Sequence, residues 1–377
     1  MSKSLISRRP AFRRGASSVR GKETPAAAES PLRRLGWKPF FQQQLSLDEL
    51  TDCEPVKVMA VHRSQIEVTG ERGDEAVLVH GQLFEDATER PTVGDWLLLA
   101  RETRKPLRRL DRSSLFKRMA PGARQAQLIA ANVDNVLIVS SCNHDFNLSR
   151  VERYLALVKE AGCRACLVLT KADLDENHEQ YREALKGHRD LPVVLVNALD
   201  AASVAPLREY CRSGETLALL GSSGVGKSTL LNSLAGNELA ATGGIREDDS
   251  KGRHTTRHRA LYAIPEGGLL LDSPGMRELG LADVSAGLSA TFADIGALAD
   301  QCRFADCAHA SEPGCAVQSA IESGALDERR LRNWRKLESE VRRNSRTLAE
   351  SRADDKALGQ LYRTVQSHAR LRKSGEE

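Results

Sequence analysis

The sequence contains no long hydrophobic run. None of its apolar stretches approaches the ~20 consecutive residues that a membrane-spanning helix needs, so we expect no contact with a membrane. The N-terminus is basic, but no apolar segment follows it, which argues against a signal peptide. The eight cysteines are scattered along 377 residues and lack the density of a secreted disulfide framework. These absences predict a cytoplasmic protein.

Acidic residues are absent from the first 22 positions. This segment holds seven basic residues, although the net charge of the whole chain is only +4: Lys3, Arg8, Arg9, Arg13, Arg14, Arg20 and Lys22. Blocks of like charge are typical of disordered tails, many of which bind polyanions. We therefore predict that residues 1–34 form a disordered basic tail with a role in nucleic-acid binding.

A small β-barrel is predicted after this tail, in a chain long enough for two or three domains. Residues 54–112 contain short alternating segments separated by turn residues, namely VKVMAVH, QIEVTG, EAVLVHG and WLLLA. This spacing predicts about five strands, in a domain that spans 35–112 and includes an aromatic segment at 35–50 packed against the strands. An OB-fold fits this size and commonly binds RNA, and a purely structural barrel is the alternative.

A second domain is predicted over residues 113–281. The strongly basic stretch 107–124 is expected to connect it to the barrel. Strands and helices then alternate, which predicts a mostly parallel α/β sheet. The expected strands are 133–141, 164–169, 192–196, 216–220, 259–264 and 268–272, and the expected helices include 148–160, 176–186 and 203–210. No strand is expected beyond residue 281, so residues 282–377 are predicted to be helical, with a charged tail.

A phosphate-binding loop is predicted between the strand at 216–220 and a helix that begins at residue 227. Its residues match the pattern G-x-x-x-x-G-K-[ST]: Gly221, Ser222, Ser223, Gly224, Val225, Gly226, Lys227 and Ser228, followed by Thr229. Glycines let backbone N–H groups face phosphate oxygens, and the helix N-terminus adds its positive dipole end. We expect Lys227 to reach the β- and γ-phosphates and Ser228 to bind Mg²⁺. The strand–loop–helix context disfavours the alternative, a chance glycine-rich turn.

A motif that precedes this loop indicates that the nucleotide is GTP. Thr170, Lys171, Ala172 and Asp173 close a strand and resemble the N-K-x-D signature of GTPases, with threonine in place of asparagine. The Asp173 carboxylate can accept hydrogen bonds from both N1–H and the exocyclic amine of guanine. Adenine offers no such pair of donors, and Lys171 would lie along the ring.

The end of the next predicted strand carries a second base-binding candidate. Asn197 and Ala198 resemble the S-A element whose backbone N–H meets guanine O6. Each motif is a weak indication alone. Because both stand at the carboxyl end of a predicted strand, where α/β sheets bind ligands, together they favour guanine.

The γ-phosphate side of the site is predicted from two further stretches. Asp272 and Gly275 form a D-x-x-G motif at the end of a strand. Asp272 would hold Mg²⁺ through water, and the Gly275 N–H would sense the γ-phosphate. The polar stretch 252–256 is expected to be a switch loop, in which we favour Thr256 over Thr255 as the residue that completes the Mg²⁺ shell.

Met276 follows Gly275, at a position where many GTPases carry a glutamine that orients water. A thioether cannot orient water, so we predict slow intrinsic hydrolysis that needs a partner. His254 is a candidate for the missing group because imidazole can hydrogen-bond the attacking water. A solvated or RNA-facing histidine is the alternative.

The order of these motifs is circularly permuted. The base-binding motifs at 170–173 and 197–198 precede the phosphate-binding loop, whereas that loop comes first in the common GTPase arrangement. Permutation is tolerated where chain termini lie close together at the surface. As a consequence, the D-x-x-G motif leads directly into the C-terminal region.

A cysteine and histidine cluster lies in that region. Its members have the spacing C-x4-C-x-H-x5-C: Cys302, Cys307, His309 and Cys315. Three thiolates and an imidazole make a tetrahedral set with no open position, which predicts one structural Zn²⁺ that stabilises a segment with little core of its own. Reduced buried cysteines near an unrelated histidine are the alternative. In contrast, Cys163-x-x-Cys166 begins a strand, and its alternation favours packing over redox chemistry.

The permuted order, the barrel in front and the Cys₃His spacing behind resemble one family, the RsgA/YjeQ ribosome small subunit-dependent GTPases. The resemblance covers residues 35–334 and depends on the stretches DRSSLFKR, IAANVD, TKADL, GSSGVGKSTLLN, GRHTT and DSPGMREL. It implies an OB-fold, a circularly permuted P-loop GTPase domain and a zinc domain that contact 16S rRNA. It also implies GTP hydrolysis, stimulated by the 30S subunit, in late 30S maturation, with release on hydrolysis.

The family resemblance places the proposed catalytic histidine at His254, and it finds departures at Thr170, Asn197, Arg257 and the basic N-terminal extension. We expect a monomer with catalytic roles for Lys227 and His254. A nucleotide-gated RNA-binding scaffold with incidental hydrolysis is the second hypothesis. An ATPase or P-loop kinase is disfavoured by the combination of TKAD and D-x-x-G.

Overall fold

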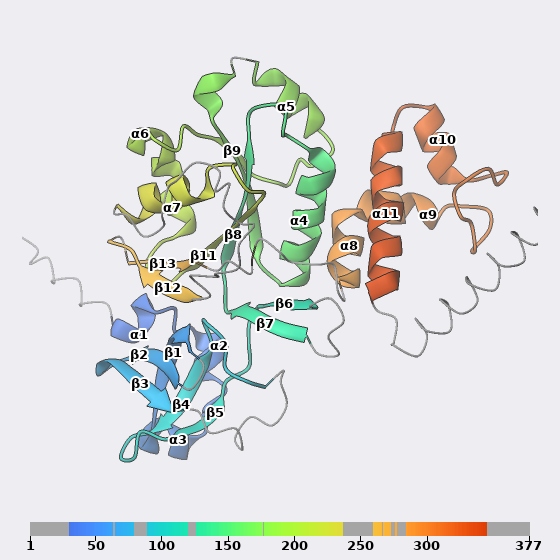
Figure 1. Ribbon diagram of the computed structural model, residues 1–377. Helices are drawn as coiled ribbons and strands as arrows, with labels where there is room; N and C mark the ends of the chain where they lie inside the picture. The colour runs from blue at the N-terminus through green and yellow to red at the C-terminus, as the bar shows by residue number, and fades with distance from the viewer. Residues whose placement is uncertain are drawn as a thin grey trace, which may run out of the picture.

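Three regions follow one another along the chain in the computed structural model (Figure 1). The structure describes residues 30–62, 65–78, 89–119, 126–175, 177–236, 259–265, 267–272, 276 and 284–344. Within these ranges, no helix combines the length and the apolar character needed to cross a membrane.

Three short helices precede the barrel: α1 (Pro31–Arg34), α2 (Pro39–Gln42) and α3 (Leu47–Asp52). The prediction of disorder is wrong for α1, because a proline fits the first helical turn and Leu32 is buried. Residues 1–29 lie outside the described residues. The aromatic segment packs as predicted, with the ring of Trp37 edge-on to Trp96 at 4.8 Å between centroids and Phe41 stacked on Trp37 at 5.8 Å.

The described residues of the barrel form five antiparallel strands: β1 (Cys53–Val61), β2 (Gln65–Gly70), β3 (Gly73–Leu78), β4 (Trp96–Ala100) and β5 (Pro106–Arg109). Their order is β3-β2-β1-β4-β5, so the β4–β5 hairpin returns to the far side of β1, which gives the OB-fold. Strand β4 is buried on both faces. Leu97 and Leu99 enter the barrel core, whereas Trp96 and Leu98 face the aromatic segment.

The basic stretch 107–124, which we predicted to connect the two domains, also contributes a strand to a hairpin that was not predicted. β6 (Leu115–Met119) pairs with β7 (Ala126–Ala131). The hydrophobic alternation that would predict β6 is difficult to recognise in this basic sequence. Phe116 is buried in the core, whereas Lys117 and Arg118 on the same short strand are partly exposed. The hairpin touches the barrel backbone at Gly94, where an added Cβ would lie 2.0 Å from the Ala131 carbonyl oxygen.

The second domain is the predicted mostly parallel α/β sheet. Its strands are β8 (Asn135–Ser141), β9 (Arg164–Thr170), β10 (Val193–Leu195), β11 (Thr216–Gly221), β12 (Ala260–Ala263) and β13 (Leu269–Asp272). They run in the order β10-β9-β8-β11-β13-β12, and among these six described strands β12 alone is antiparallel to its neighbour. One pair, Ala60 with Ala260, joins β12 to β1 and makes the barrel continuous with this sheet.

Helices cover both faces of the sheet (Figure 1). They are α4 (Leu148–Glu160), α5 (Glu179–Ala184), α6 (Ala201–Val204) and α7 (Lys227–Ala235), with 3-10 turns at Ala172–Leu174 and Ala205–Tyr210. The predicted range of α4 is correct. The predicted helix at 203–210 is largely 3-10 in the structure, and a proline lies in its first turn.

The described part of the C-terminal region, residues 284–344, is helical, as predicted: α8 (Ser285–Thr291), α9 (Ala293–Ala299), α10 (Ala316–Glu322) and α11 (Glu328–Asn344). No strand occurs between residues 284 and 344. α8 and α11 lie on the side of α4 that faces away from the sheet (Figure 1). α8 approaches α4 closely at Gly287, where an added Cβ would lie 2.1 Å from the Ala156 carbonyl oxygen.

Candidate functional site

The predicted phosphate-binding loop connects the buried strand β11 to the first turn of α7. Two of its glycines are required by geometry. At Gly221, an added Cβ would lie 2.3 Å from the Val139 carbonyl oxygen, and Gly226 has a φ of +89° at the N-cap of α7. The loop therefore exposes backbone between β8 and β13, at the carboxyl edge of the sheet.

Lys227 lies inside this loop. Its side chain is buried, and its Nζ donates to the carbonyl oxygen of Gly221 at 2.8 Å and to that of Ser222. The ammonium group therefore contacts the main chain of the loop at its first two residues. Ser228 and Thr229 follow in the first turn of α7, half-buried.

Thr170 connects the base-binding motif to the phosphate-binding loop. It is the last residue of β9 and is fully buried, and its Oγ1 lies 2.6 Å from the Val225 carbonyl oxygen and 3.1 Å from that of Ser140. Threonine therefore replaces the usual asparagine with another side chain that can donate a hydrogen bond to the phosphate-binding loop. Lys171 follows in a left-handed conformation, with a φ of 58°, and Asp173 is exposed at the same edge.

The Asn197 element lies beside this motif. The Ala172 N–H donates to the Val196 carbonyl at 3.3 Å, which joins the two chain segments at the ends of β9 and β10. Asn197 uses its side chain within its own turn, where Oδ1 accepts from the Leu199 N–H at 3.0 Å, and Ala198 is buried. The structure therefore brings three of the predicted motifs together at one edge of the sheet.

The γ-phosphate side is described only in part. Asp272 ends β13 at the same edge, next to the phosphate-binding loop strand. Met276 is buried and belongs to the apolar core cluster that includes residues of β8, β9 and α4, so its side chain packs into the protein interior. His254, Thr256 and Gly275 lie outside the described residues.

One residue at this edge was missed in the sequence. Arg150, in the first turn of α4, donates from Nη1 to the Ser222 hydroxyl at 2.7 Å and to both carboxylate oxygens of Asp145, at 3.1 and 3.2 Å. No motif marks this arginine, because it belongs to an ordinary amphipathic helix. Its position in the first turn of the helix that follows β8, a strand beside β11, is the only signal that could have found it.

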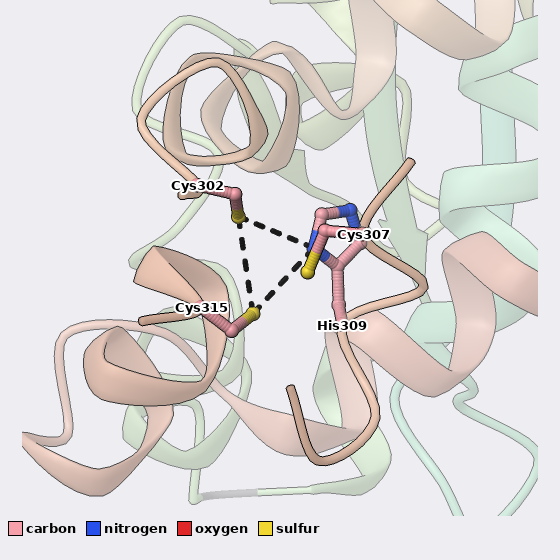
Figure 2. A group of neighbouring side chains, drawn as sticks. All are labelled: Cys302, Cys307, His309 and Cys315. Atoms are coloured by element: carbon pink, nitrogen blue, oxygen red, sulfur yellow. Dashed lines mark hydrogen bonds between the residues drawn. The ribbon is translucent and has the colours of Figure 1, made fainter. Parts of the chain in front are cut away.

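The four predicted metal ligands converge in space (Figure 2). Cys302 follows α9, Cys307 and His309 lie in the intervening loop, and Cys315 caps α10. Their ligand atoms all lie within 4.8 Å of one another. The Sγ atoms of Cys302 and Cys315 are 3.9 Å apart, and they lie 3.5 and 3.6 Å from His309 Nδ1.

These distances fit a tetrahedral ion. Metal–sulfur bonds of about 2.3 Å and metal–nitrogen bonds of about 2.0 Å place tetrahedral ligands ~3.8 Å apart for two sulfurs and ~3.5 Å apart for sulfur and nitrogen. The Gln318 N–H points to Cys315 Sγ at 3.4 Å, a contact that stabilises a thiolate. The cluster can therefore hold one four-coordinate metal ion.

A buried charge network joins the C-terminal region to α4. The Glu152 carboxylate is fully buried and accepts from Arg329, at 3.0 and 3.1 Å, and from Arg330, at 2.8 Å. Asn333 also donates to it, and His188 Nε2 lies 3.1 Å away. Burial acts to raise the pKa of Glu152, but hydrogen bonds from His188 and Arg329 and the two arginine charges outweigh it and lower the pKa to about 2.

The Cys163-x-x-Cys166 pair packs as predicted. Cys166 is fully buried, and Cys163 Sγ donates to the Val133 carbonyl at 3.2 Å. Burial raises the pKa of Cys163 to about 12, so the reactive thiolate is disfavoured.

Comparisons with known proteins agree with this architecture. The family model described as RsgA GTPase matches residues 109–282. The small ribosomal subunit biogenesis GTPase RsgA 2 of Vibrio parahaemolyticus is 51% identical, across 93% of this chain and 97% of that protein. The small ribosomal subunit biogenesis GTPase RsgA of Mesorhizobium japonicum is 44% identical, across 86% of this chain and 93% of its own length.

Two solved structures share the fold. YjeQ from Thermotoga maritima superposes with a TM-score of 0.56 at 25% identity, covering 77% of this chain and 98% of that one. YloQ, described as a circularly permuted GTPase, gives a TM-score of 0.56 at 24% identity, covering 79% and 98%. The chain therefore belongs to the RsgA family of GTPases.

Proposed function

We propose that this GTPase acts in late maturation of the 30S ribosomal subunit. In this account it binds 16S rRNA on the subunit, hydrolyses GTP faster when bound there, and is released on hydrolysis. It works as a cytoplasmic monomer without membrane contact. The proposal is supported by relatives named as small ribosomal subunit biogenesis GTPases and, above all, by the meeting of three nucleotide-binding motifs at one sheet edge, with Thr170 bonded to the Val225 carbonyl.

The phosphate end of GTP is assigned to the loop from Gly221 to Gly226. Backbone N–H groups of the loop, including those of Ser222, Ser223, Gly224 and Val225, and of Thr229 in the helix, would face the phosphate oxygens. Lys227 would exchange the carbonyl oxygens of Gly221 and Ser222 for the β- and γ-phosphates, which are stronger acceptors because they are charged.

Magnesium is assigned to the same edge. When bound, Mg²⁺ would neutralise charge on the β- and γ-phosphates. Ser228 and Thr256 would be its ligands, Asp272 would reach it through water, and the Gly275 N–H would contact the γ-phosphate. The Ser228 hydroxyl and the Asp272 carboxylate are both oxygen ligands of the kind that Mg²⁺ prefers.

Guanine is assigned to the ends of β9 and β10. Asp173 would accept from N1–H and the exocyclic amine, Lys171 would lie along the ring, and the Ala198 N–H would meet O6. Thr170, Ala172 and Asn197 would hold these groups in place through the contacts described above.

Slow intrinsic turnover follows from Met276. Its side chain is buried in the core, so it cannot orient the attacking water. His254 is the proposed replacement, in a switch segment that the ribosome would help to position.

The Cys₃His cluster is assigned to one structural Zn²⁺. All four positions are protein ligands, so no position is open for a substrate. We assign residues 35–112 to the RNA-binding barrel, extended at its start by α1, residues 113–281 to the GTPase domain and residues 282–377 to the zinc-binding domain and C-terminal helices. The basic residues 1–29 form the remaining tail.

GTP turnover with and without purified 30S subunits tests the proposal. We expect a low rate alone and a rate at least tenfold higher with 30S subunits, and no stimulation would overturn the assignment. The variant Lys227→Ala distinguishes the proposed GTP hydrolase from the second hypothesis, a nucleotide-gated RNA-binding scaffold. If 30S maturation proceeds normally in cells that carry only this variant, hydrolysis is incidental and the scaffold is correct.

A further inference from the structure

A second cation lies against the phosphate-binding loop. Arg150 is the third residue of α4, and its backbone N–H donates to the side chain of the N-cap residue, Asn147, at 3.1 Å. Its side chain crosses to the loop, where Nη1 donates to the Ser222 hydroxyl at 2.7 Å. Ser222 thus contacts two cations, since its carbonyl oxygen accepts from Lys227.

The attachment of Arg150 is loose. Asp145 accepts from the same nitrogen, Nη1, through both of its oxygens, instead of forming a two-nitrogen pair. The two side chains are 37% and 40% exposed, and ion pairs of this kind contribute about 0–1 kcal/mol. Within the described part of the chain, the Nε and Nη2 groups of Arg150 meet no acceptor, so the guanidinium keeps donors for a further ligand.

Hydrolysis of GTP is accelerated by positive charge near the γ-phosphate. Charge spreads over the γ-phosphoryl oxygens in the transition state of hydrolysis, and an arginine that binds them typically accelerates the reaction by about 10³- to 10⁵-fold. Met276 supplies neither charge nor a hydrogen bond to water. The Arg150 guanidinium lies one hydrogen bond from the second residue of the phosphate-binding loop.

We propose that Arg150 is a catalytic arginine supplied by the chain itself. In the transition state, its guanidinium releases the Ser222 hydroxyl and binds the γ-phosphoryl oxygens. In that step the water oxygen bonds to the γ-phosphorus as the bond from phosphorus to the β–γ bridging oxygen breaks. GDP leaves with the electron pair, and the protons of water pass to inorganic phosphate and solvent. This inference extends the proposed function, because it assigns a residue to the same hydrolysis.

The test compares full-length Arg150→Ala and Arg150→Lys with the wild type in the presence of 30S subunits. We expect kcat to fall about 10³-fold in the alanine variant and less in the lysine variant, with GTP and GDP affinities within about threefold of the wild type. Tight binding of GDP with aluminium fluoride, which mimics the planar phosphoryl group, should be lost. Arg182→Ala is the control, since Arg182 lies on α5 in an exposed pair with Glu179.

A structural role gives different results. If Arg150 only holds α4 against the phosphate-binding loop, Arg150→Ala should weaken the binding of GDP and of GDP–aluminium fluoride equally, or leave kcat unchanged. Either result would show that the inference is wrong. Asp145→Asn provides a second measurement in case the first variant unfolds. A kcat equal to or above the wild-type value supports the inference, because the arginine is released, and a loss like that of Arg150→Ala overturns it. If the wild type itself is not stimulated by 30S subunits, the proposed function fails instead.

Discussion

The nucleotide-binding edge and the α4–α11 interface are built from opposite kinds of contact. At the edge, most of the contacts described above are to backbone: Thr170 meets the Val225 carbonyl, and Lys227 meets the carbonyls of Gly221 and Ser222. At the interface, the buried carboxylate of Glu152 accepts hydrogen bonds from two arginines and an asparagine. Side-chain charges thus hold the C-terminal region to α4, whereas main-chain contacts dominate the nucleotide site, and α4 contacts both regions through Arg150 and Glu152.

If the Cys₃His cluster holds the proposed Zn²⁺, removal of this ion should have the largest effect on structure. Structural Zn²⁺ contributes on the order of 10 kcal/mol in small domains. After chelation, or in Cys302→Ser, we expect hydrogen exchange of residues 302–322 to lose its protection, while GTP affinity changes by less than about threefold. Unchanged exchange in the metal-free protein would contradict a structural ion, and an equal loss of GTP binding would show that the two regions are not separable.

Loss of the Glu152 carboxylate should have the next largest effect, a decrease in the free energy of unfolding. Glu152→Ala leaves Arg330 buried without its partner on α4, and breaking such a pair costs about 3–5 kcal/mol. Urea unfolding followed by circular dichroism measures this difference. Glu179→Ala is the matched control, because Glu179 forms an exposed pair with Arg182 and its loss should cost less than about 1 kcal/mol. Similar values for both variants would mean that the network does not hold the interface.

Acid should weaken the same interface. The pKa of Glu152 is lowered to about 2 in the folded protein, so its contribution is complete above the ordinary glutamate pKa and is lost as pH falls toward 2. The contribution is on the order of 3 kcal/mol. Between pH 5 and pH 2, the free energy of unfolding of the wild type should fall by about this amount more than that of Glu152→Gln. Parallel pH profiles for the two proteins would contradict the assignment.

A smaller effect is expected at the nucleotide edge. Thr170→Val keeps the shape of the side chain but removes the hydroxyl that meets the Val225 carbonyl, a loss of about 1 kcal/mol. Isothermal titration should show GTP binding about fivefold weaker. Thr170→Ser, which keeps the hydroxyl, is the control and should bind as the wild type does. Equal affinities for the valine and serine variants would show that this bond does not brace the loop.

The sequence predicted the edge well because its residues are constrained locally. Gly221 and Gly226 cannot be replaced without a clash or a strained φ, and Lys227 stands at a fixed spacing from them. The phosphate-binding motif can therefore be recognised from residues that are close together in the sequence. The Cys₃His cluster was predicted for the same reason. The α4 range was predicted from its periodicity, and the mostly parallel sheet was predicted from the alternation of strands and helices.

The interface and the hairpin could not be predicted in this way. Glu152 and Arg330 are 178 residues apart, and each resembles a surface charge on an amphipathic helix until the two helices meet. The β6 strand was concealed by Lys117 and Arg118, whose charge indicated a connector. Arg150 was missed because its role depends on which strand lies beside β8, which only the folded sheet reveals.

The most direct test of the central claim, that three motifs form one guanine-nucleotide site, is the nucleotide preference of Asp173→Asn. Loss of two hydrogen bonds to a charged acceptor should weaken GTP by about 100-fold. The same change should improve binding of xanthosine triphosphate, whose exocyclic oxygen can accept from the new amide. Titration of both nucleotides against the variant and the wild type measures this directly. A reversal of preference is the predicted result, and unchanged GTP affinity would contradict the account.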